Sequence, residues 1–122
     1  MSKIVQAINA MILRPDRITE VFRGAHSKTE YFFIFMGKYK WSVDQDAPGL
    51  TIYYYPGTES TKQLAELDGE KWNHISMVSY TAKNLNSREA TESMKELHTL
   101  LTERVYGLSE VLDDIIGSDY NG

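Results

Sequence analysis

The chain contains no cysteine, which excludes disulfide bonds, thiolate catalysis and zinc sites of the cysteine type. It has three histidines, and no two of them share the short spacing of a metal-binding pair: His26, His74 and His98. We therefore expect no metal site and no cofactor. The lack of cysteine also fits a reducing compartment such as the cytoplasm.

Long hydrophobic runs and an excess of basic residues are also missing. The apolar stretch near the N-terminus is too short and interrupted for a signal peptide, and no later run approaches the length of a membrane span. We expect a soluble cytoplasmic protein. Its 13 Lys and Arg against 17 Asp and Glu give a net charge of −4, which argues against binding to duplex nucleic acid. A small phosphorylated ligand stays compatible, because it needs only two or three cations in one pocket.

Catalytic motifs are absent from the sequence. There is no P-loop, GxGxxG, GxSxG or HExxH pattern, and no pair of acids is placed as an obvious general acid and base. Asp113 and Asp114 are adjacent rather than facing, which is typical of a solvated helix end. We therefore predict no catalytic residues and favour a binding module over an enzyme.

The chain of 122 residues has no repeats and no linker, so we expect a single domain, 1–122. Ser2 can cap a first helix with an apolar face that Pro15 interrupts. A second short helix is expected around Ile18, Val21 and Phe22, with Gly24 as its end. These two helices would form an N-terminal helical unit.

The central part of the chain is extended in character. Tyr31–Met36 is an apolar run typical of a strand covered on both faces. The expected meander has a turn at Gly37-Lys38, a strand Tyr39–Val43 with Tyr39, Trp41 and Val43 inward, a turn at Asp46–Gly49, and a strand Leu50–Tyr55. Ser60 and Gln63 indicate a capped helix through Leu67, and Trp72–Tyr80 is expected as one more strand. The predicted fold class is α+β, with an antiparallel sheet of about four strands, N-terminal helices and a long C-terminal helix.

Asn86 and Glu89 offer a cap for the C-terminal helix, and a kink is expected at Gly107. Apolar residues recur at three- and four-residue steps along it: Ala90, Met94, Leu97, Leu101, Leu108, Leu112 and Ile115. Arg104 falls inside this stripe, so its guanidinium should point toward whatever the helix packs against. Three partners would satisfy it: a carboxylate of this chain, a carboxylate of a second subunit, or a ligand phosphate.

Polar and aromatic residues near the start of this helix form a candidate ligand site. Tyr80 is a candidate for stacking on a base, and Asn84, Asn86 and Arg88 can read a base edge or a ribose. The cluster Tyr53–Tyr55 has two interpretations, packing in a core or dimer interface, and stacking on a base. Alternation places Tyr54 on one face and its two neighbours on the other.

A second candidate site consists of short basic loops. Gly37 and Lys38 form either a plain hairpin bend or a small anion-binding nest with a cation beside it. Arg23 and His26 flank a predicted helix end, where they either favour the carbonyl dipole or contact a phosphate.

Four stretches of the chain resemble the first family of phage anti-Thoeris proteins. They are Ser2–Leu13, Lys38–Ser42, the turn Tyr53–Gly57, and the ending Arg104–Gly107 with Val111–Ile116. The resemblance implies a non-enzymatic sponge that captures a cyclic ADP-ribose isomer made by a bacterial immune TIR-domain enzyme. It also implies an antiparallel sheet with helices, assembly as dimers and hexamers, and ligand pockets between subunits.

The resemblance assigns phosphate binding to Arg104, and it implies that cyclic di- or trinucleotides can occupy separate sites. Tyr80, Asn84 and Asn86 are chosen by their own chemistry. The expected function is thus sequestration of an immune signal in the cytoplasm of an infected bacterium, by a homodimer or hexamer. Two alternatives stay open: a protein-binding inhibitor or immunity protein that uses the acidic C-terminal helix, and a small cyclic-nucleotide phosphodiesterase.

Overall fold

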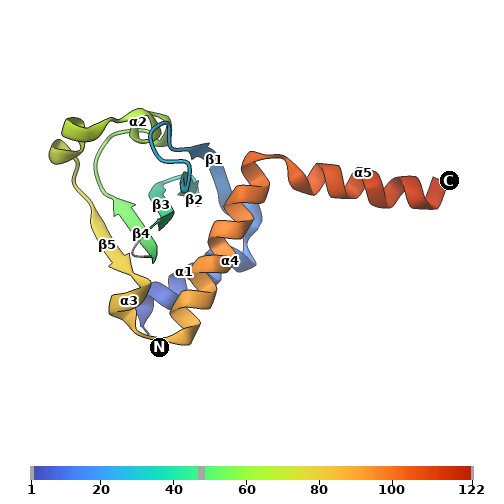
Figure 1. Cartoon of the computed structure of the whole chain (residues 1–122), viewed down its shortest axis with the longest axis horizontal. Coiled ribbons are helices and arrows are strands. Elements are labelled where there is room, and N and C mark those ends of the chain that lie inside the picture. Colours follow the sequence, from blue (N-terminus) through green and yellow to red (C-terminus); the bar gives the residue numbers. More distant parts are fainter. Residues whose placement is uncertain (1, 47–48, 122) are drawn as a thin grey trace.

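The computed structural model describes residues 2–46 and 49–121. It contains one five-stranded antiparallel sheet in the order β1-β2-β3-β4-β5, with helices before, between and after the strands (Figure 1). The elements in chain order are α1 (Lys3–Leu13), η1 (Pro15–Arg17), β1 (Ile18–Arg23), β2 (Glu30–Phe35), β3 (Tyr39–Asp46), β4 (Gly49–Tyr55), α2 (Thr61–Glu66), η2 (Gly69–His74), β5 (Val78–Thr81), α3 (Ala82–Leu85), α4 (Arg88–Val105) and α5 (Leu108–Asn121). The α+β class is confirmed, with five strands in place of about four.

Two predicted helix starts are confirmed by their caps. The hydroxyl of Ser2 accepts from the backbone N–H of Val5, and α1 ends just before Pro15. Ser60 and Gln63 form the reciprocal capping box of α2. In both places a short polar side chain satisfies backbone donors that have no partner inside the helix.

The second predicted helix is wrong, because Ile18–Arg23 is the edge strand β1. A register shift between Thr19 and Phe22 marks a bulge, and Glu20 adopts φ 51° there. The extra residue moves Val21 to the face of the sheet that carries Ile18, and a three-residue step results. A bulged strand therefore imitates the apolar spacing of a helix. This strand accounts for the fifth member of the sheet.

The meander β2-β3-β4 is confirmed, with Tyr31 opposite Val43 and Val43 opposite Ile52. Val43 is buried as predicted, but the alternation predicted for β3 is wrong at Tyr39, which is 39% exposed, and Ser42 on the opposite face is fully buried. A second layer of side chains covers the face of the sheet that carries Ser42. The alternation of polar and apolar residues in β3 therefore does not predict which side chains are exposed to solvent. Of the predicted turn after Asp46, Ala47 and Pro48 lie outside the described residues.

The strand predicted over Trp72–Tyr80 is shorter in the structure. Trp72 and His74 belong to the 3-10 helix η2, and only Val78–Thr81 pairs with β4. The Trp72 ring stacks on Phe32 at a centroid distance of 6.0 Å, so it covers the sheet instead of continuing it. An aromatic residue at a strand-like position has become part of a covering layer.

The sheet is packed on both faces. On one face α1 and α4 enclose the larger core together with side chains such as Phe33 and Ile52, and the two helices lie side by side (Figure 1). On the other face α2 and η2 cover a smaller core around Phe32 and Tyr55. The strands are therefore apolar on both sides, as expected for a central layer.

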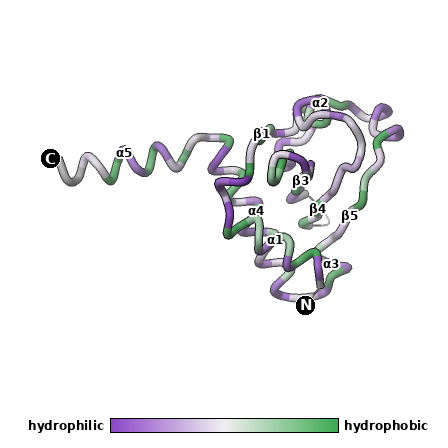
Figure 2. The backbone as a smooth tube through the Cα atoms, turned by 180° about the vertical axis from the view of Figure 1, so that it is seen from behind, coloured by the Kyte–Doolittle hydropathy of each residue, from purple (hydrophilic) through white to green (hydrophobic). Residues whose placement is uncertain are grey.

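The predicted C-terminal helix is two helices. Ser87 caps α4 by accepting from the backbone N–H of Ala90, whereas Asn86, the predicted cap, ends α3 in a left-handed conformation. Gly107, with φ 62°, separates α4 from α5, so the expected kink is a break. α5 projects away from the body (Figure 1), and apolar and polar stretches alternate along it (Figure 2).

Candidate functional site

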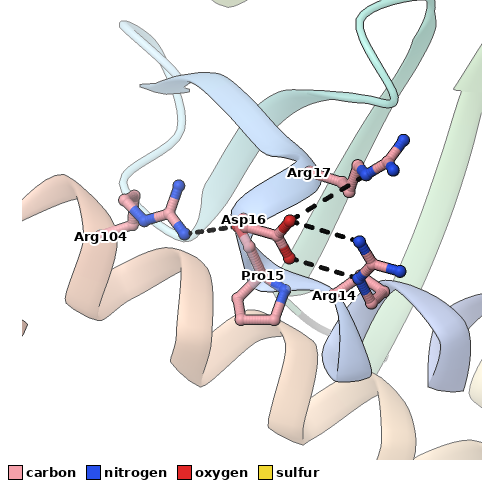
Figure 3. Close-up of polar contacts among 5 residues, drawn as sticks. All are labelled: Arg14, Pro15, Asp16, Arg17 and Arg104. Atoms are coloured by element: carbon pink, nitrogen blue, oxygen red, sulfur yellow. Dashed lines mark hydrogen bonds and ion pairs between the residues drawn. The ribbon is translucent and has the colours of Figure 1, made fainter.

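Arg104 bridges the last turn of α4 and the start of β1. Its Nη1 donates to the carbonyl of Ile18 at 2.6 Å. Its Nη2 donates to the carbonyl of Pro15 at 2.8 Å, the contact drawn in Figure 3. The side chain points toward the body as predicted, but the residue is exposed. In the described part of the chain its partners are backbone carbonyls, so of the three partners considered for Arg104 a carboxylate of this chain is not the one that it contacts.

Two more arginines surround η1. The carboxylate of Asp16 lies 3.4 Å from Nε of Arg14 and 4.0 Å from Nε of Arg17, and Figure 3 shows both on the side away from Arg104. The hydrogen bond with Arg14 holds the pKa of Asp16 below its usual value. Two guanidinium groups therefore flank the Asp16 carboxylate, and Arg104 lies on the other side of η1 against backbone carbonyls.

A hollow of 560 Å³ lies beside Arg104 at the base of α5, and its volume is typical of small-ligand pockets. Its lining combines one cation with two carboxylates and an apolar wall: Pro15, Leu100, Glu103, Arg104, Gly107, Ser109 and Glu110. Two of the five guanidinium donors of Arg104 are used by the carbonyls. The remaining donors are available for an anion.

The other residues of the predicted ligand site lie around α3. Asn84 lines a hollow of 440 Å³, and Asn86 and Arg88 line an adjoining one of 310 Å³. Tyr80 is half-buried and packs against the larger core, so its ring is less accessible than a stacking role requires. Among the described residues, the ion pair of Arg88 is a loose one with Glu92, at 3.9 Å.

Two lysines in the same place were missed by sequence reasoning. Lys83 lines both hollows and Lys95 lines the larger one. Lys83 stands inside the polar stretch 81–88, so its position was a usable signal. Lys95 lies on α4 seven residues after Arg88, about two helical turns, so a helical projection would have placed it on the same face as Arg88.

The structure does not bring Arg104 and Arg88 together within one chain. They lie at opposite ends of α4, sixteen residues apart, which corresponds to about 24 Å along a helix. One chain therefore holds the predicted ligand residues in two separate places: the Arg104 hollow, and the two hollows around Lys83, Asn84 and Arg88.

The four residues of the second predicted site are also separated. Arg23 and His26 lie near the start of β2, whereas Gly37 and Lys38 follow its end. Met36 and Gly37 both have positive φ, as in a tight hairpin turn, which fits the interpretation of this bend as a plain hairpin. Lys38 lies 5.0 Å from the centre of the Tyr39 ring, and Arg23 donates to the hydroxyl of Tyr106.

A buried polar chain on the opposite face of the sheet was not predicted as a site. Ser42 Oγ donates to Glu30 Oε2 at 2.8 Å and lies 2.7 Å from the hydroxyl of Tyr55. Burial raises the pKa of Glu30 to about 7, although the Ser42 hydrogen bond acts in the other direction. Burial likewise raises the pKa of the Tyr55 and Tyr53 hydroxyls. The usable signals were Glu30, an acid directly before an apolar strand, and the aromatic alternation of β4.

Comparison of the chain with protein-family models, curated proteins and solved structures finds no match. The function must therefore be inferred from the residues themselves and from the resemblance described above. Within residues 2–46 and 49–121, no helix is both long and apolar enough to cross a membrane. The same residues contain no cluster of three or more His, Asp or Glu side chains suited to a metal ion.

Proposed function

We propose that the protein captures a cyclic ADP-ribose isomer produced by bacterial anti-phage immunity and holds it, uncleaved, between two subunits in the infected cell's cytoplasm. The observation that carries this proposal is the position of the Arg104 hollow at the base of an uncovered helix. α5 begins where the hollow ends, since Ser109 and Glu110 belong to both. A partner that covers α5 would also close the hollow.

The exposed apolar side chains of α5 support a second copy as that partner. A helix of 14 residues without packing is only marginally stable in water. Its apolar residues are between about one third and two thirds exposed: Leu108 36%, Val111 48%, Leu112 46%, Ile115 60% and Ile116 55%. In a homodimer with two-fold symmetry the apolar stripe of each α5 can be buried against the same surface of the other subunit. A second copy of the chain therefore covers both stripes with one interface.

Two-fold symmetry could also unite these two places. When a surface pairs with itself, a residue away from the symmetry axis meets a different residue of the other subunit, and the reverse contact follows. If the dimer that covers α5 also pairs the α4 helices in antiparallel orientation, the Arg104 end of one subunit would lie beside the Lys83, Asn84 and Arg88 end of the next. Such a dimer would carry two equivalent pockets.

The chemistry of the combined pocket suits an ADP-ribose ring. Arg104 retains guanidinium donors for a diphosphate, and Lys83 and Arg88 would add positive charge from the other subunit. Glu103 and Glu110 can accept hydrogen bonds from ribose hydroxyls, and Asn84 can read a base edge. These groups bind and orient a ligand, and none is arranged as a nucleophile with its base.

Calorimetric titration against a panel of cyclic ADP-ribose isomers tests the proposal. We expect one isomer to bind, and heat denaturation of the complex to release it intact in chromatography. Arg104→Ala should weaken binding at least tenfold, because a charge-assisted hydrogen bond contributes about 1.5–3 kcal/mol. Lys62→Ala, which removes an exposed cation on the other face of the sheet, is the matched control and should bind normally.

A variant that leaves Arg104 in place tests whether ligand binding depends on assembly of the subunits. Leu112→Glu with Ile115→Glu should abolish both assembly and ligand binding if the pocket lies between subunits. Full binding by a monomeric form of this variant would refute the inter-subunit pocket. A ligand recovered in hydrolysed form would instead support the phosphodiesterase alternative.

Cyclic di- or trinucleotides are proposed as a second ligand class at a separate site. In one chain Lys38 and Arg23 lie at opposite ends of β2, so this site also needs more than one subunit. Lys38→Glu should weaken cyclic trinucleotide binding and leave the ADP-ribose signal bound. Equal loss of both ligands, or of neither, would remove this part of the proposal.

A protein-binding inhibitor is the second candidate function, and the projecting helix favours it. Acidic side chains alternate with the apolar stripe on α5, as on a helix that docks into a basic groove: Glu110, Asp113 and Asp114. Competition between the nucleotide signal and the TIR-domain enzyme distinguishes the two. Inhibition of the enzyme that persists when the signal is in excess would favour the inhibitor.

A further inference from the structure

A carboxylate and three aromatic rings meet on the face of the sheet opposite α4. Glu30 of β2, Tyr53 and Tyr55 of β4, Trp72 of η2, and Met77 line a hollow of 200 Å³. We name this group of residues the Glu30 hollow. It is separate from the Arg104 hollow and from those around α3, which lie on other elements.

The hydrogen bonds around Glu30 point their protons toward the carboxylate. Because Ser42 donates to Glu30, its own oxygen is left to accept from the Tyr55 hydroxyl. The two hydroxyls thus form a hydrogen-bonded chain from Tyr55 through Ser42 to Oε2 of Glu30. In the described part of the chain Oε1 has no hydrogen-bond partner, so it can face a ligand.

Negative charge at this place has no counter-charge in the described residues. Asp44 lies opposite Glu30 in the β2–β3 ladder and accepts from Thr29 at 2.7 Å, so two carboxylates are adjacent. Neither forms an ion pair with a described cation. Lys40, on the same face of β3, donates instead to the carbonyls of Gly57 and Glu59.

The rings add a second attraction for positive charge. The centroids of Tyr53 and Tyr55 are 6.4 Å apart, and those of Tyr55 and Trp72 are 6.1 Å apart, so the rings are neighbours along the hollow. Aromatic faces carry negative potential and attract cations within about 6 Å of their centres. A carboxylate combined with such faces is a familiar arrangement for alkylated ammonium groups.

We propose that the Glu30 hollow binds a small organic ammonium ion, with the half-buried rings of Tyr53 and Trp72 beside the cation and Glu30 as its counter-charge. The volume supports this class, since 200 Å³ is below the range of about 300–1,000 Å³ that drug-sized ligands need. A nucleotide is therefore too large. Anions are excluded by Glu30 and Asp44.

Protonation links the site to pH. Burial raises the pKa of Glu30 to about 7, so part of the unliganded protein carries a neutral Glu30 at neutral pH. A bound cation favours the ionised form and lowers this pKa. Asp44, Tyr53 and Tyr55 are the other titratable groups here, and of these the Asp44 charge acts on Glu30 to raise its pKa. Binding should therefore release protons near pH 7 and strengthen as the pH rises from 5.5 to 8.

Choline and its neutral isostere 3,3-dimethylbutan-1-ol provide the test. At pH 8 we expect choline to produce saturable changes in tryptophan fluorescence and in the NMR signals of the Trp72 indole. The neutral isostere should bind at least tenfold more weakly. Glu30→Gln, which keeps an acceptor for Ser42, and Trp72→Leu should each weaken choline binding at least tenfold, with folding checked by circular dichroism.

Arg104→Ala is the control that separates this site from the proposed nucleotide pocket. It should leave choline binding unchanged, whatever it does to the ADP-ribose signal. Equal binding of choline and its isostere would overturn the proposal, as would full choline binding by folded Glu30→Gln. Failure of choline, tetramethylammonium and butylammonium to bind at millimolar concentration would overturn it as well.

Discussion

Nη1 of Arg23 donates to the hydroxyl of Tyr106 at 2.7 Å, joining the end of β1 to the residue at which α4 stops. Tyr106 directly precedes Gly107, so this bond holds the chain just before α5 begins. The residue is 61% exposed, and the hydroxyl bond is the polar anchor of its ring. Arg23 thus has a structural role at the base of α5.

Tyr106→Phe should loosen this base while leaving the rest of the fold in place. The lost bond is exposed, so we expect no more than about 1 kcal/mol of destabilisation. Amide hydrogen exchange should nevertheless become faster in residues 106–112. Unchanged exchange there would show that Gly107 and the neighbouring backbone hold the bend without the Arg23 bond.

Arg104→Ala should lower the free energy of unfolding by roughly 1–2 kcal/mol, as measured by urea denaturation. The carbonyls of Pro15 and Ile18 lose their donor, but the site is exposed and water can replace it. Arg104→Lys should recover part of the loss, because an ammonium reaches one carbonyl. A loss of about 3–5 kcal/mol, typical of a stranded buried charge, would contradict the observed contacts.

Glu30→Gln should change how stability depends on pH. The pKa of Glu30 is raised from its ordinary value of 4.5 to about 7 in the folded protein, so between these values the folded state binds more protons than the unfolded state. The free energy of unfolding of the parent should therefore fall as the pH rises from 4.5 to 7 and then level off.

For Glu30→Gln this decline should be absent, and at pH 8 the variant should be more stable than the parent by up to about 3 kcal/mol. Thermal melts of both proteins from pH 4 to 8 make the comparison. Parallel curves would show that Glu30 has an ordinary pKa in the folded state.

The uncovered stripe on α5 predicts self-association of the parent protein. Light scattering at micromolar concentration should give a dimer or a larger even assembly, and Leu112→Glu with Ile115→Glu should give a monomer. Asp113→Lys with Asp114→Lys, a change on acidic positions of the same helix, should assemble normally. A parent protein that is monomeric would count against any pocket between subunits.

Local signals in the sequence were sufficient to predict an element where a single side chain determines where that element begins or turns. The Ser2 cap and the Ser60–Gln63 box each satisfy named N–H groups, so α1 and α2 were predictable. The antiparallel meander was predictable for a similar reason, because the Gly37 turn separates runs with the strand period. These signals involve residues a few positions apart.

The failures come from contacts that sequence spacing does not encode. The bulge at Glu20 shifts the phase of β1, and Trp72 leaves the sheet to lie on it. Arg104 was predicted to need an acidic side chain or a phosphate, but backbone carbonyls satisfy it and have no sequence signature. The Glu30 hollow is formed by residues of β2, β3, β4 and η2, which the sheet pairing brings together, so no single stretch of the sequence predicts it.

Gly107 sets the direction in which α5 leaves the end of α4. The apolar stripe of α4 continues in phase into α5, so a right-handed helical residue at this position would allow one continuous rod from residue 88 to 121. The left-handed φ of 62° diverts the chain instead, and crowding does not force it to do so, because a Cβ at this position would meet no atom within 4 Å. An arm of 14 residues is about 21 Å long, so a change of about 30° at its base moves the tip by roughly 10 Å. The direction of α5 is thus set by the backbone angles of one residue, at a point where substitution can redirect the helix while the packed body stays the same.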